Sequence, residues 1–593
     1  MKQFEAIRDS GLFSGWTFAI AVGILLLVSI AVGKREKPQL RGSGKFAGTT
    51  GIIRRYGDWS RLPLSLFAIL LIYALLLVTA GYILHALWGW DGFTGRVWMT
   101  TILIELFLIA IALYIALFLD RFKKINRYPF GQIRYLGFRV TLWLPEKDRF
   151  EHIKIQGRAG VGKTTGFMFP GLISDAAGEC SAVALDVKSP ELFETVAGAW
   201  SARGKKVILW DPYHSDCIGF EPLGAAGPNA LSRIEESVYG KRDTSANAQS
   251  IFFDDQERRL FRLCCRLVQS YKDPAQCNLP MVHQLALRGA PAIEAAVTYC
   301  HNPLLQEEFN HLFNNRQRVP DLIGGMLNKL DLFSDPKIAA AFSRPDLDLD
   351  VLFREPTLLI IASPQSNPKS RLGAAIVLRS VMLKIFERPT RGEGLPIFFY
   401  LDEFYNLHLP EMPDFVNTAR STRTGVITFL QTHEQLYQYQ RHEIGSLSIN
   451  QKLQIYLQGC DIAHCKELSE RLGKTLIKDK RVSRSRGRRS QTISYSEAPL
   501  MTPDSIQMLP NDVALCFSSD LRPFLVKRLF SYKSAEFKRR TRLPASAYRP
   551  CTEPLSTPSY RDLDLPGPES FTPSNASSPR LPGAPGGKDV PGW

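Results

Sequence analysis

The chain lacks any cysteine pattern that would hold a metal ion or a disulfide framework. Its ten cysteines are scattered along 593 residues, without a C-x-x-C pair or a cysteine–histidine cluster at metal-ligand spacing. Cysteines spread in this way are typical of reduced thiols in the core of a cytoplasmic domain. The sequence therefore predicts neither a zinc site nor disulfides.

Acidic residues are outnumbered by basic ones. The chain has 57 Asp and Glu residues against 73 Lys and Arg, which gives a formal net charge of +16 and a pI near 9.3. Such an excess favours polyanionic partners, either nucleic acid or anionic lipid headgroups. Charge alone leaves both classes open.

Charged residues are nearly missing from three long segments, near 12–32, 62–88 and 97–119. Each reaches the roughly 20 apolar residues that a helix needs to cross a bilayer. No A-x-A cleavage signal follows the first segment, which favours an uncleaved anchor over a signal peptide. We therefore expect residues 1–122 to form a transmembrane anchor.

The orientation of this anchor follows from its flanking charges. The loop 33–61 and the exit from the third segment, which contains Arg121 and Lys123, are rich in Lys and Arg. Because such charge stays on the cytoplasmic side, the chain after the anchor should be cytoplasmic. The first segment then starts outside although Lys2 and Arg8 precede it, so a re-entrant or interfacial position is the alternative.

Long apolar runs give way to short ones after residue 150. Eight of these short runs have the form of buried strands, and the lengths between them suit crossover helices. This alternation predicts an α/β domain with a mostly parallel sheet. The eight runs are EHIKIQG (151–157), SAVALDV (181–187), KVILWDP (206–212), TLLIIAS (357–363), IFFYLDE (397–403), GVITFLQT (425–432), KLQIYLQG (452–459) and DVALCFS (512–518).

A glycine-rich motif follows the first of these strands. GRAGVGKT matches G-x-x-x-x-G-K-[ST] and lies between an expected strand and an expected helix, a context that disfavours a chance match. Backbone N–H groups of such a loop surround the phosphates of ATP, Lys163 reaches the β- and γ-phosphates, and Thr164 is a ligand of Mg²⁺. The expected ATP-binding residues are Gly157, Arg158, Ala159, Gly160, Val161, Gly162, Lys163, Thr164 and Thr165.

A pair of acids ends the strand IFFYLDE. Asp402 is the candidate for holding the metal with Thr164, and Glu403 is the candidate for orienting and deprotonating the attacking water. The alternative is a solvated turn. With the phosphate loop upstream, the pair favours ATP hydrolysis.

Three further polar residues are candidates for catalysis. Gln431 ends the next strand, where its amide could sense the γ-phosphate, unless it is only a polar strand end. Arg420 and Arg423 precede that strand and are candidate arginine fingers toward a neighbouring subunit. A solvated face or a DNA contact is the alternative for both arginines.

With these motifs in place, the chain resembles the type IV coupling proteins, the TraG, TraD and TrwB family of membrane-anchored RecA-like ATPases. The resemblance covers most of residues 120–535. Besides the two nucleotide motifs it rests on LDVKSPELFETVAGAWSARGKKVILWDP (185–212), EPL (221–223), QTHEQL (431–436), DIAHCKELSERLG (461–473), LMTPDSIQMLPNDVALCF (500–517) and RPF (522–524). The chain departs from the family pattern at two points. EPL stands where the family usually has Asn-Pro-Leu, and the chain has three apolar segments where two are commoner.

The resemblance implies a RecA-like P-loop ATPase domain at 123–222 and 351–535. Segments between them have helical spacing, so we expect an inserted all-α domain at 223–350. The family further implies a multi-pass protein of the bacterial inner membrane that assembles as a homo-hexamer. It would recruit relaxase-bound DNA, or protein effectors, to a type IV secretion channel and power their transfer during conjugation.

Two segments are too polar to build a core. The stretch 474–496 is dense in Lys, Arg and Ser, which suits phosphate contact, although a disordered surface loop is the alternative. Because aromatic residues are nearly absent from it, any DNA contact should be independent of sequence. The tail 536–593 is basic and then rich in Pro, Ser and Gly, so we expect disorder.

Other functions fit less well. A translocase of the FtsK kind would carry a C-terminal winged-helix reader, whereas this tail is rich in proline; a HerA-like translocase stays open. A membrane scaffold that uses nucleotide only as a structural ligand need not keep both metal and water partners. An ABC transporter is disfavoured because no LSGGQ-like signature is present.

Overall fold

The computed structural model describes most of the chain after residue 125. The described ranges are 46–57, 126–135, 138–224, 228–242, 247–270, 277–314, 317–388, 394–439, 441–448, 451–485, 488–551 and 553–556. The three apolar segments expected to span the membrane, and the tail after 556, lie outside them. Within these ranges no helix is both long and apolar enough to cross a membrane.

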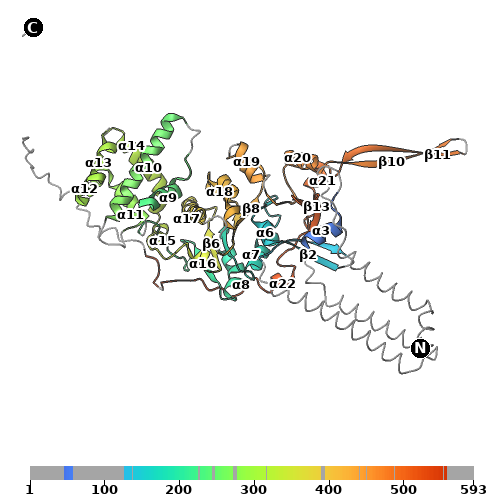
Figure 1. Ribbon diagram of the computed structural model, residues 1–593, viewed down its shortest axis with the longest axis horizontal. Coiled ribbons are helices and arrows are strands. Elements are labelled where there is room, and N and C mark those ends of the chain that lie inside the picture. The colour runs from blue at the N-terminus through green and yellow to red at the C-terminus, as the bar shows by residue number, and fades with distance from the viewer. Residues whose placement is uncertain are drawn as a thin grey trace, which may run out of the picture. The chain divides into compact units, whose positions relative to one another are not determined.

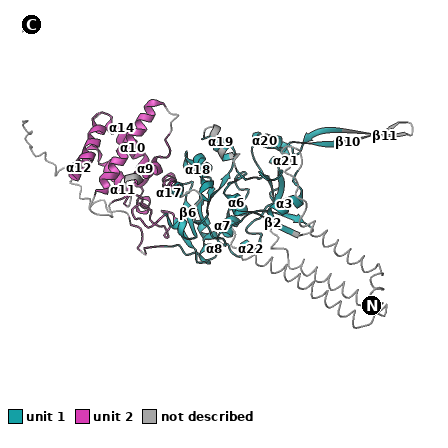
Figure 2. Ribbon diagram, in the orientation of Figure 1, with its two compact units in different colours: residues 1–209, 349–366, 384–548 teal, residues 210–348, 367–383, 549–593 magenta. Residues whose placement is uncertain are grey.

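The chain divides into two compact units, coloured in Figure 2. Unit 1 comprises residues 1–209, 349–366 and 384–548, and unit 2 comprises 210–348, 367–383 and 549–593. Unit 1 is an α/β structure, whereas the described part of unit 2 is built from helices.

An 11-stranded sheet organises unit 1, in the order β2-β1-β13-β12-β9-β3-β8-β7-β4-β6-β5. The run from β9 to β6 is parallel, and β12, β13, β1 and β2 extend it in antiparallel fashion. The strands are β1 (Tyr128–Tyr135), β2 (Phe138–Leu144), β3 (Ile153–Gln156), β4 (Ser181–Asp186), β5 (Lys206–Trp210), β6 (Thr357–Ala362), β7 (Ile397–Asp402), β8 (Thr424–Leu430), β9 (Leu453–Tyr456), β12 (Val513–Ser518) and β13 (Phe524–Lys527).

The predicted α/β fold with a large parallel sheet is confirmed. Strands β3, β4, β6 and β8 are buried at every position, and β4, β6 and β8 therefore appear in the sequence as mostly apolar runs, whereas β3 also buries Lys154 and Gln156. The antiparallel extension was not predicted in full. Strand β13, for example, alternates between buried and exposed residues, a weaker signal over four residues.

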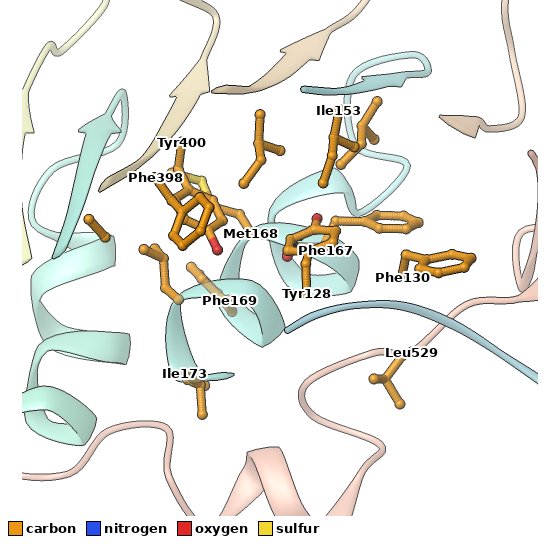
Figure 3. Packing of buried hydrophobic residues seen from close by; sticks show 14 of the residues in the cluster. Tyr128, Phe130, Ile153, Phe167, Met168, Phe169, Ile173, Phe398, Tyr400 and Leu529 are labelled. Atoms are coloured by element: carbon orange, nitrogen blue, oxygen red, sulfur yellow. Dashed lines mark hydrogen bonds between the residues drawn. The ribbon is translucent and has the colours of Figure 1, made fainter. Parts of the chain in front are cut away.

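Helices cover the sheet of unit 1 and complete its core. Figure 3 shows Phe167, Met168 and Phe169, from the helical segment after the phosphate loop, packed with Tyr128 and Tyr400. These helical elements are α3 (Thr49–Tyr56), α6 (Glu146–Arg149), η2 (Thr164–Met168), α7 (Phe169–Asp175), η3 (Phe193–Ala197), α8 (Gly198–Ser201), α16 (Val351–Arg354), η6 (Phe404–Leu407), α18 (Met412–Ala419), η7 (Arg420–Thr422), η8 (Glu434–Leu436), α19 (Arg441–Ser448), α20 (Ile462–Leu472), α21 (Pro503–Gln507) and α22 (Ala535–Lys538).

Unit 2 packs its helices around the long α10, whose buried face includes Phe261 and Leu267. Glu235 accepts hydrogen bonds from Arg258 and Arg262, which joins α9 to α10. The helical elements are α9 (Pro228–Tyr239), α10 (Ala248–Gln269), α11 (Leu279–Leu287), α12 (Gly289–Cys300), α13 (Pro303–Phe313), α14 (Val319–Leu330), η5 (Asp331–Ser334), α15 (Pro336–Ala341) and most of α17 (Pro368–Phe386).

Two segments that the sequence marks as polar have structure. The basic stretch forms an antiparallel hairpin of β10 (Lys474–Ser485) and β11 (Arg488–Pro499) in unit 1 (Figure 1). The beginning of the expected disordered tail forms α22, and Tyr548 donates a backbone hydrogen bond to the carbonyl of Val207 at 2.7 Å.

Candidate active site

Most of the candidate catalytic side chains lie where the parallel strands have their carboxyl ends. Strand β8 lies between β3 and β7, and the three strands run parallel. The register pairs Gln156 with Leu430 and Asp402 with Phe429, so the three strands end at the same level. The phosphate loop, Glu403 and Gln431 follow these strand ends, the usual position of ligands in open α/β sheets.

The phosphate loop turns tightly between β3 and η2. Gly160 and Gly162 have φ angles of 73° and 83°, a region that residues with a Cβ rarely adopt. Lys163 is buried, and its ammonium donates to the carbonyls of Gly157 at 2.8 Å and Arg158 at 3.3 Å. Burial lowers the pKa of Lys163, while Asp402 and Glu403 act in the opposite direction.

Thr164 and Asp402 lie together at the floor of this edge. The Thr164 hydroxyl donates to Oδ2 of Asp402 at 3.4 Å, and Oδ1 of Asp402 is buried without a hydrogen-bond partner. Burial raises the pKa of Asp402 to about 6, although Lys163 opposes the shift. A buried oxygen without a partner beside a hydroxyl fits the oxygen ligands that Mg²⁺ prefers.

Glu403 is held by two amides. Its carboxylate accepts hydrogen bonds from the side chains of Gln431 and Gln365, one on each oxygen. Its backbone has φ 48°, an uncommon conformation for a residue other than glycine and one that recurs at functional sites. The structure thus brings Glu403 and Gln431 together, and it adds Gln365, which the sequence analysis missed because no motif surrounds it.

Arg528 is a second residue that the sequence analysis missed. Its guanidinium donates to the carbonyls of Val161 at 2.8 Å and Gly162 at 2.6 Å, and it is only 5% exposed. The same group lies 4.6 Å from the ring centroid of Phe530. Arg528 follows β13 and therefore fixes the backbone of the phosphate loop from the antiparallel part of the sheet.

The two candidate arginine fingers lie at the opposite edge of the sheet. Arg420 is in η7 and Arg423 precedes β8, whereas Gln431 follows it. A strand of this length spans roughly 20 Å, so neither arginine reaches the phosphate loop of its own chain. Arg423 donates to Glu146 at 3.0 Å and to the carbonyl of Gly394 at 2.9 Å. The side chain of Arg420 pairs with Glu151 at 3.2 Å and stays 64% exposed.

Comparisons with solved structures find conjugative coupling proteins. The unbound bacterial conjugative coupling protein TrwBdeltaN70 is 16% identical, with a TM-score of 0.52 over 67% of this chain and 88% of that chain. The plasmid coupling protein TrwB in complex with the non-hydrolysable ATP analogue ADPNP is 15% identical, with a TM-score of 0.52 over 68% and 90%. TrwB in complex with ADP and Mg²⁺ is 16% identical, with a TM-score of 0.48 over 69% and 92%.

The two structures with a TM-score of 0.52 share the fold of this chain. A comparison with curated protein sequences found no match. The family model for type IV secretory system conjugative DNA transfer matches residues 120–550, which is most of the chain. The chain therefore belongs to the type IV secretory system conjugative DNA transfer family.

Proposed function

We propose that this protein hydrolyses ATP with Mg²⁺ and uses the energy to move cargo into a type IV secretion channel. The observation that carries the proposal is the pairing of Thr164 with Asp402, 3.4 Å apart, beside a buried carboxylate oxygen without a partner. Lys163 lies on the loop that precedes them. The ATP analogue bound to TrwB, a protein of the same fold, supports the choice of nucleotide.

The residues of the site divide the work of hydrolysis. Thr164 and Asp402 would hold Mg²⁺, which neutralises charge on the phosphates when bound. Lys163 leaves the carbonyls of its own loop and contacts the β- and γ-phosphates. Backbone N–H groups of the loop from Gly157 to Thr165 surround the same phosphates at a helix N-terminus.

Glu403 would accept the proton of the attacking water. Gln431 and Gln365 orient its carboxylate oxygens, so a movement of either amide would change the orientation of the base toward the water. Gln431 would also sense the γ-phosphate, because it ends the strand that lies between the loop and Glu403. Hydrolysis is thereby linked to the conformation of β8.

We assign Arg420 and Arg423 to the neighbouring subunit's site. Their place at the far edge of the sheet supports a role in trans, and trans action requires an oligomer, for which we propose a homo-hexamer. Arg420 is the stronger candidate of the two, because Arg423 is tied within its own chain to Glu146 and Gly394.

The cargo and the location follow from the family. We propose that relaxase-bound DNA, contacted without sequence preference, is the main cargo, with protein effectors as the alternative. Residues 1–122 would anchor the protein in the bacterial inner membrane, beside the components of the secretion channel. Crosslinking in cells during conjugation tests this, because it should trap DNA or a relaxase on the protein.

Substitutions at the site test the hydrolysis. Lys163→Ala and Glu403→Gln should each lower ATP turnover at least a hundredfold, since one removes phosphate binding and the other the base. Glu470→Gln, which makes the same change at an exposed residue of α20, is the control and should hydrolyse ATP normally. Unchanged turnover in both site variants would overturn the assignment.

A further inference from the structure

The β10–β11 hairpin stands apart from the rest of unit 1. Its two strands pair with each other from Lys474↔Pro499 to Ser485↔Arg488, and they form a sheet of their own. Figure 1 shows the hairpin extending away from α20 and α21. At about 3.3 Å per residue, twelve residues give it a length of roughly 40 Å.

An isolated two-stranded hairpin is at best marginally stable in water. Near its base, Leu476 and Tyr495 are 67% and 64% exposed, so the described protein core does not cover them. A ribbon of this length whose described large apolar side chains are exposed is best explained by a partner that it contacts in function.

The residues of the two strands indicate the chemistry of that partner. The strands contain seven basic residues and two acids. The basic residues are Lys474, Lys478, Lys480, Arg481, Arg484, Arg488 and Arg489, and the acids are Asp479 and Glu497. The cations concentrate toward the end of the ribbon, where the register pairs Arg484 with Arg489 and Ser485 with Arg488. Like charges placed opposite each other destabilise a hairpin unless an anion lies between them.

The uncharged residues in the half of the hairpin far from α20 favour nucleic acid over anionic lipid as the partner. Between Arg481 and Thr492 the single large apolar residue is Val482, and the others that are not basic are Ser, Gly, Gln and Thr. Insertion into a lipid interface needs an apolar face, which this half does not supply. Hydroxyl and amide side chains donate to phosphate oxygens alongside Lys and Arg in nucleic-acid complexes.

The size of the ribbon also fits nucleic acid. The major groove of DNA admits a two-stranded β-ribbon, and a ribbon of roughly 40 Å matches about one turn of duplex, 34–36 Å. We propose that the β10–β11 hairpin is an arm that binds the sugar–phosphate backbone of the transferred nucleic acid.

The base of this arm is linked to the candidate active site. Helix α20 ends at Leu472, directly before β10, and its His464 stacks on His433 with ring centroids 4.7 Å apart. His433 follows Gln431 by two residues, and Gln431 donates to Glu403. Nucleic acid on the arm should therefore stimulate hydrolysis, a consequence that rests on the proposed ATPase function.

Binding to full-length protein tests the arm. In one variant Arg481, Arg484, Arg488 and Arg489 are each replaced by Gln. In a second, residues 480–493 are replaced by Asn-Gly, which suits a two-residue hairpin turn and keeps the pair Asp479↔Ser494. A matched control removes four exposed cations elsewhere in unit 1. The control residues, each changed to Gln, are Lys466, Lys538, Arg539 and Arg542.

Fluorescence anisotropy of labelled single-stranded and duplex DNA should show at least tenfold weaker binding in both arm variants. The slope of log affinity against log salt should decrease by about three in the variant with four Gln residues, since each lost phosphate contact contributes about 0.7 to 0.9. It should decrease further in the shortened hairpin, which loses six basic residues. The control should keep affinity and slope. Equal losses in control and arm variants, or no loss in the arm variants, would overturn the proposal.

Two further measurements separate the alternatives. Sedimentation with vesicles of phosphatidylserine and phosphatidylcholine should be the same for all variants, and a loss confined to the arm variants, with DNA binding intact, would assign the arm to lipid instead. ATP turnover without DNA should be unchanged in the arm variants, and its stimulation by DNA should be lost. If the unaltered protein has no ATP turnover, the proposed function fails. The DNA-binding measurements still show whether the hairpin binds nucleic acid.

Discussion

At the scale of single residues, we expect Asp402 to make nucleotide binding sensitive to pH. Burial raises its pKa to about 6, and Mg²⁺ requires the deprotonated carboxylate. We therefore expect the affinity for Mg²⁺ and ATP to be constant above pH 7 and to fall up to tenfold per unit below pH 6. Titration of the protein with a fluorescent ATP analogue and Mg²⁺ between pH 5 and 8 measures this.

Two variants check the assignment of this titration. Asp402→Asn should bind weakly at every pH, whereas Asp512→Asn should follow the unaltered protein, because Lys527 lowers the pKa of the exposed Asp512. The stability of the fold without nucleotide should depend on pH in the opposite direction. Since the folded pKa of Asp402 exceeds that of the unfolded chain, its proton stabilises the fold at low pH, and this contribution is lost as pH rises through about 6. A pH dependence that persists in Asp402→Asn would exclude this residue as its source.

The departure from the family pattern at EPL also has a local explanation. The carboxylate of Glu221 accepts backbone hydrogen bonds from Leu223 at 2.6 Å and Gly224 at 2.7 Å, and the residue is 8% exposed. A carboxylate has two acceptor oxygens, whereas an asparagine amide has one. Glu221 therefore satisfies both donors of the turn by itself.

At the scale of elements, a buried ion pair joins α6 to α7, and the hydroxyl of Tyr400 ties the pair to β7. Asp175 accepts from Arg149 at 2.6 and 2.8 Å and from the hydroxyl of Tyr400 at 2.6 Å, and the side chains of Asp175 and Arg149 are fully buried. Asp175→Ala leaves the Arg149 charge unpaired, so we expect the free energy of unfolding to fall by about 3–5 kcal/mol. Urea denaturation followed by tryptophan fluorescence measures it.

An exposed ion pair provides the comparison. Lys384 pairs with Asp350 at 3.1 Å with side chains 31% and 42% exposed, and Lys384→Ala should cost at most about 1 kcal/mol. Equal stability of Asp175→Ala and Lys384→Ala would show that the buried pair does not hold the two elements together.

Elements also show where prediction from the sequence succeeded. All eight runs expected as strands are strands, because a strand covered on both faces is largely apolar. The last two strands at one side of the sheet, β1 and β2, are partly exposed and carry mixed residues such as Arg134 and Arg139, so they resemble loops in the sequence. The basic stretch became the β10–β11 hairpin through cross-strand pairing, which polarity alone does not reveal.

At the scale of the whole molecule, hydrolysis should require two subunits at each site. Arg420 lies roughly 20 Å from its own phosphate loop by strand length, so it acts on a neighbour or not at all. We expect Arg420→Ala and Lys163→Ala each to abolish turnover when alone. Co-expression of the two should restore part of it, because an intact loop then meets an intact arginine at some interfaces. ATP turnover of the mixed oligomers measures this.

A control variant shows whether a loss of turnover is specific to Arg420. Lys466→Ala, an exposed change on α20, should leave turnover intact and reports any general effect of removing a surface charge. Full turnover of Arg420→Ala alone, or no recovery in a mixture shown to co-assemble, would exclude Arg420 as a trans residue.

The sequence by itself determined the α/β class, the family and the position of the phosphate loop. Each depends on local patterns: continuous apolar runs for buried strands, and closely spaced glycines where the backbone must turn around phosphates. Thr164, Asp402 and Glu403 could be predicted because they adjoin such patterns.

Only the tertiary structure decided which distant residues complete the site. Arg528 donates a hydrogen bond to the carbonyl of Gly162, which is 366 positions away in the sequence. Gln365 donates to the carboxylate of Glu403, which is 38 positions away. Arg528 follows β13 and Gln365 follows β6, so the order of the strands in the whole sheet brings these groups to the site, and that order depends on packing between segments far apart in the chain. Local patterns carry no information on such contacts, because burial and charge pairing arise only when the sheet has assembled.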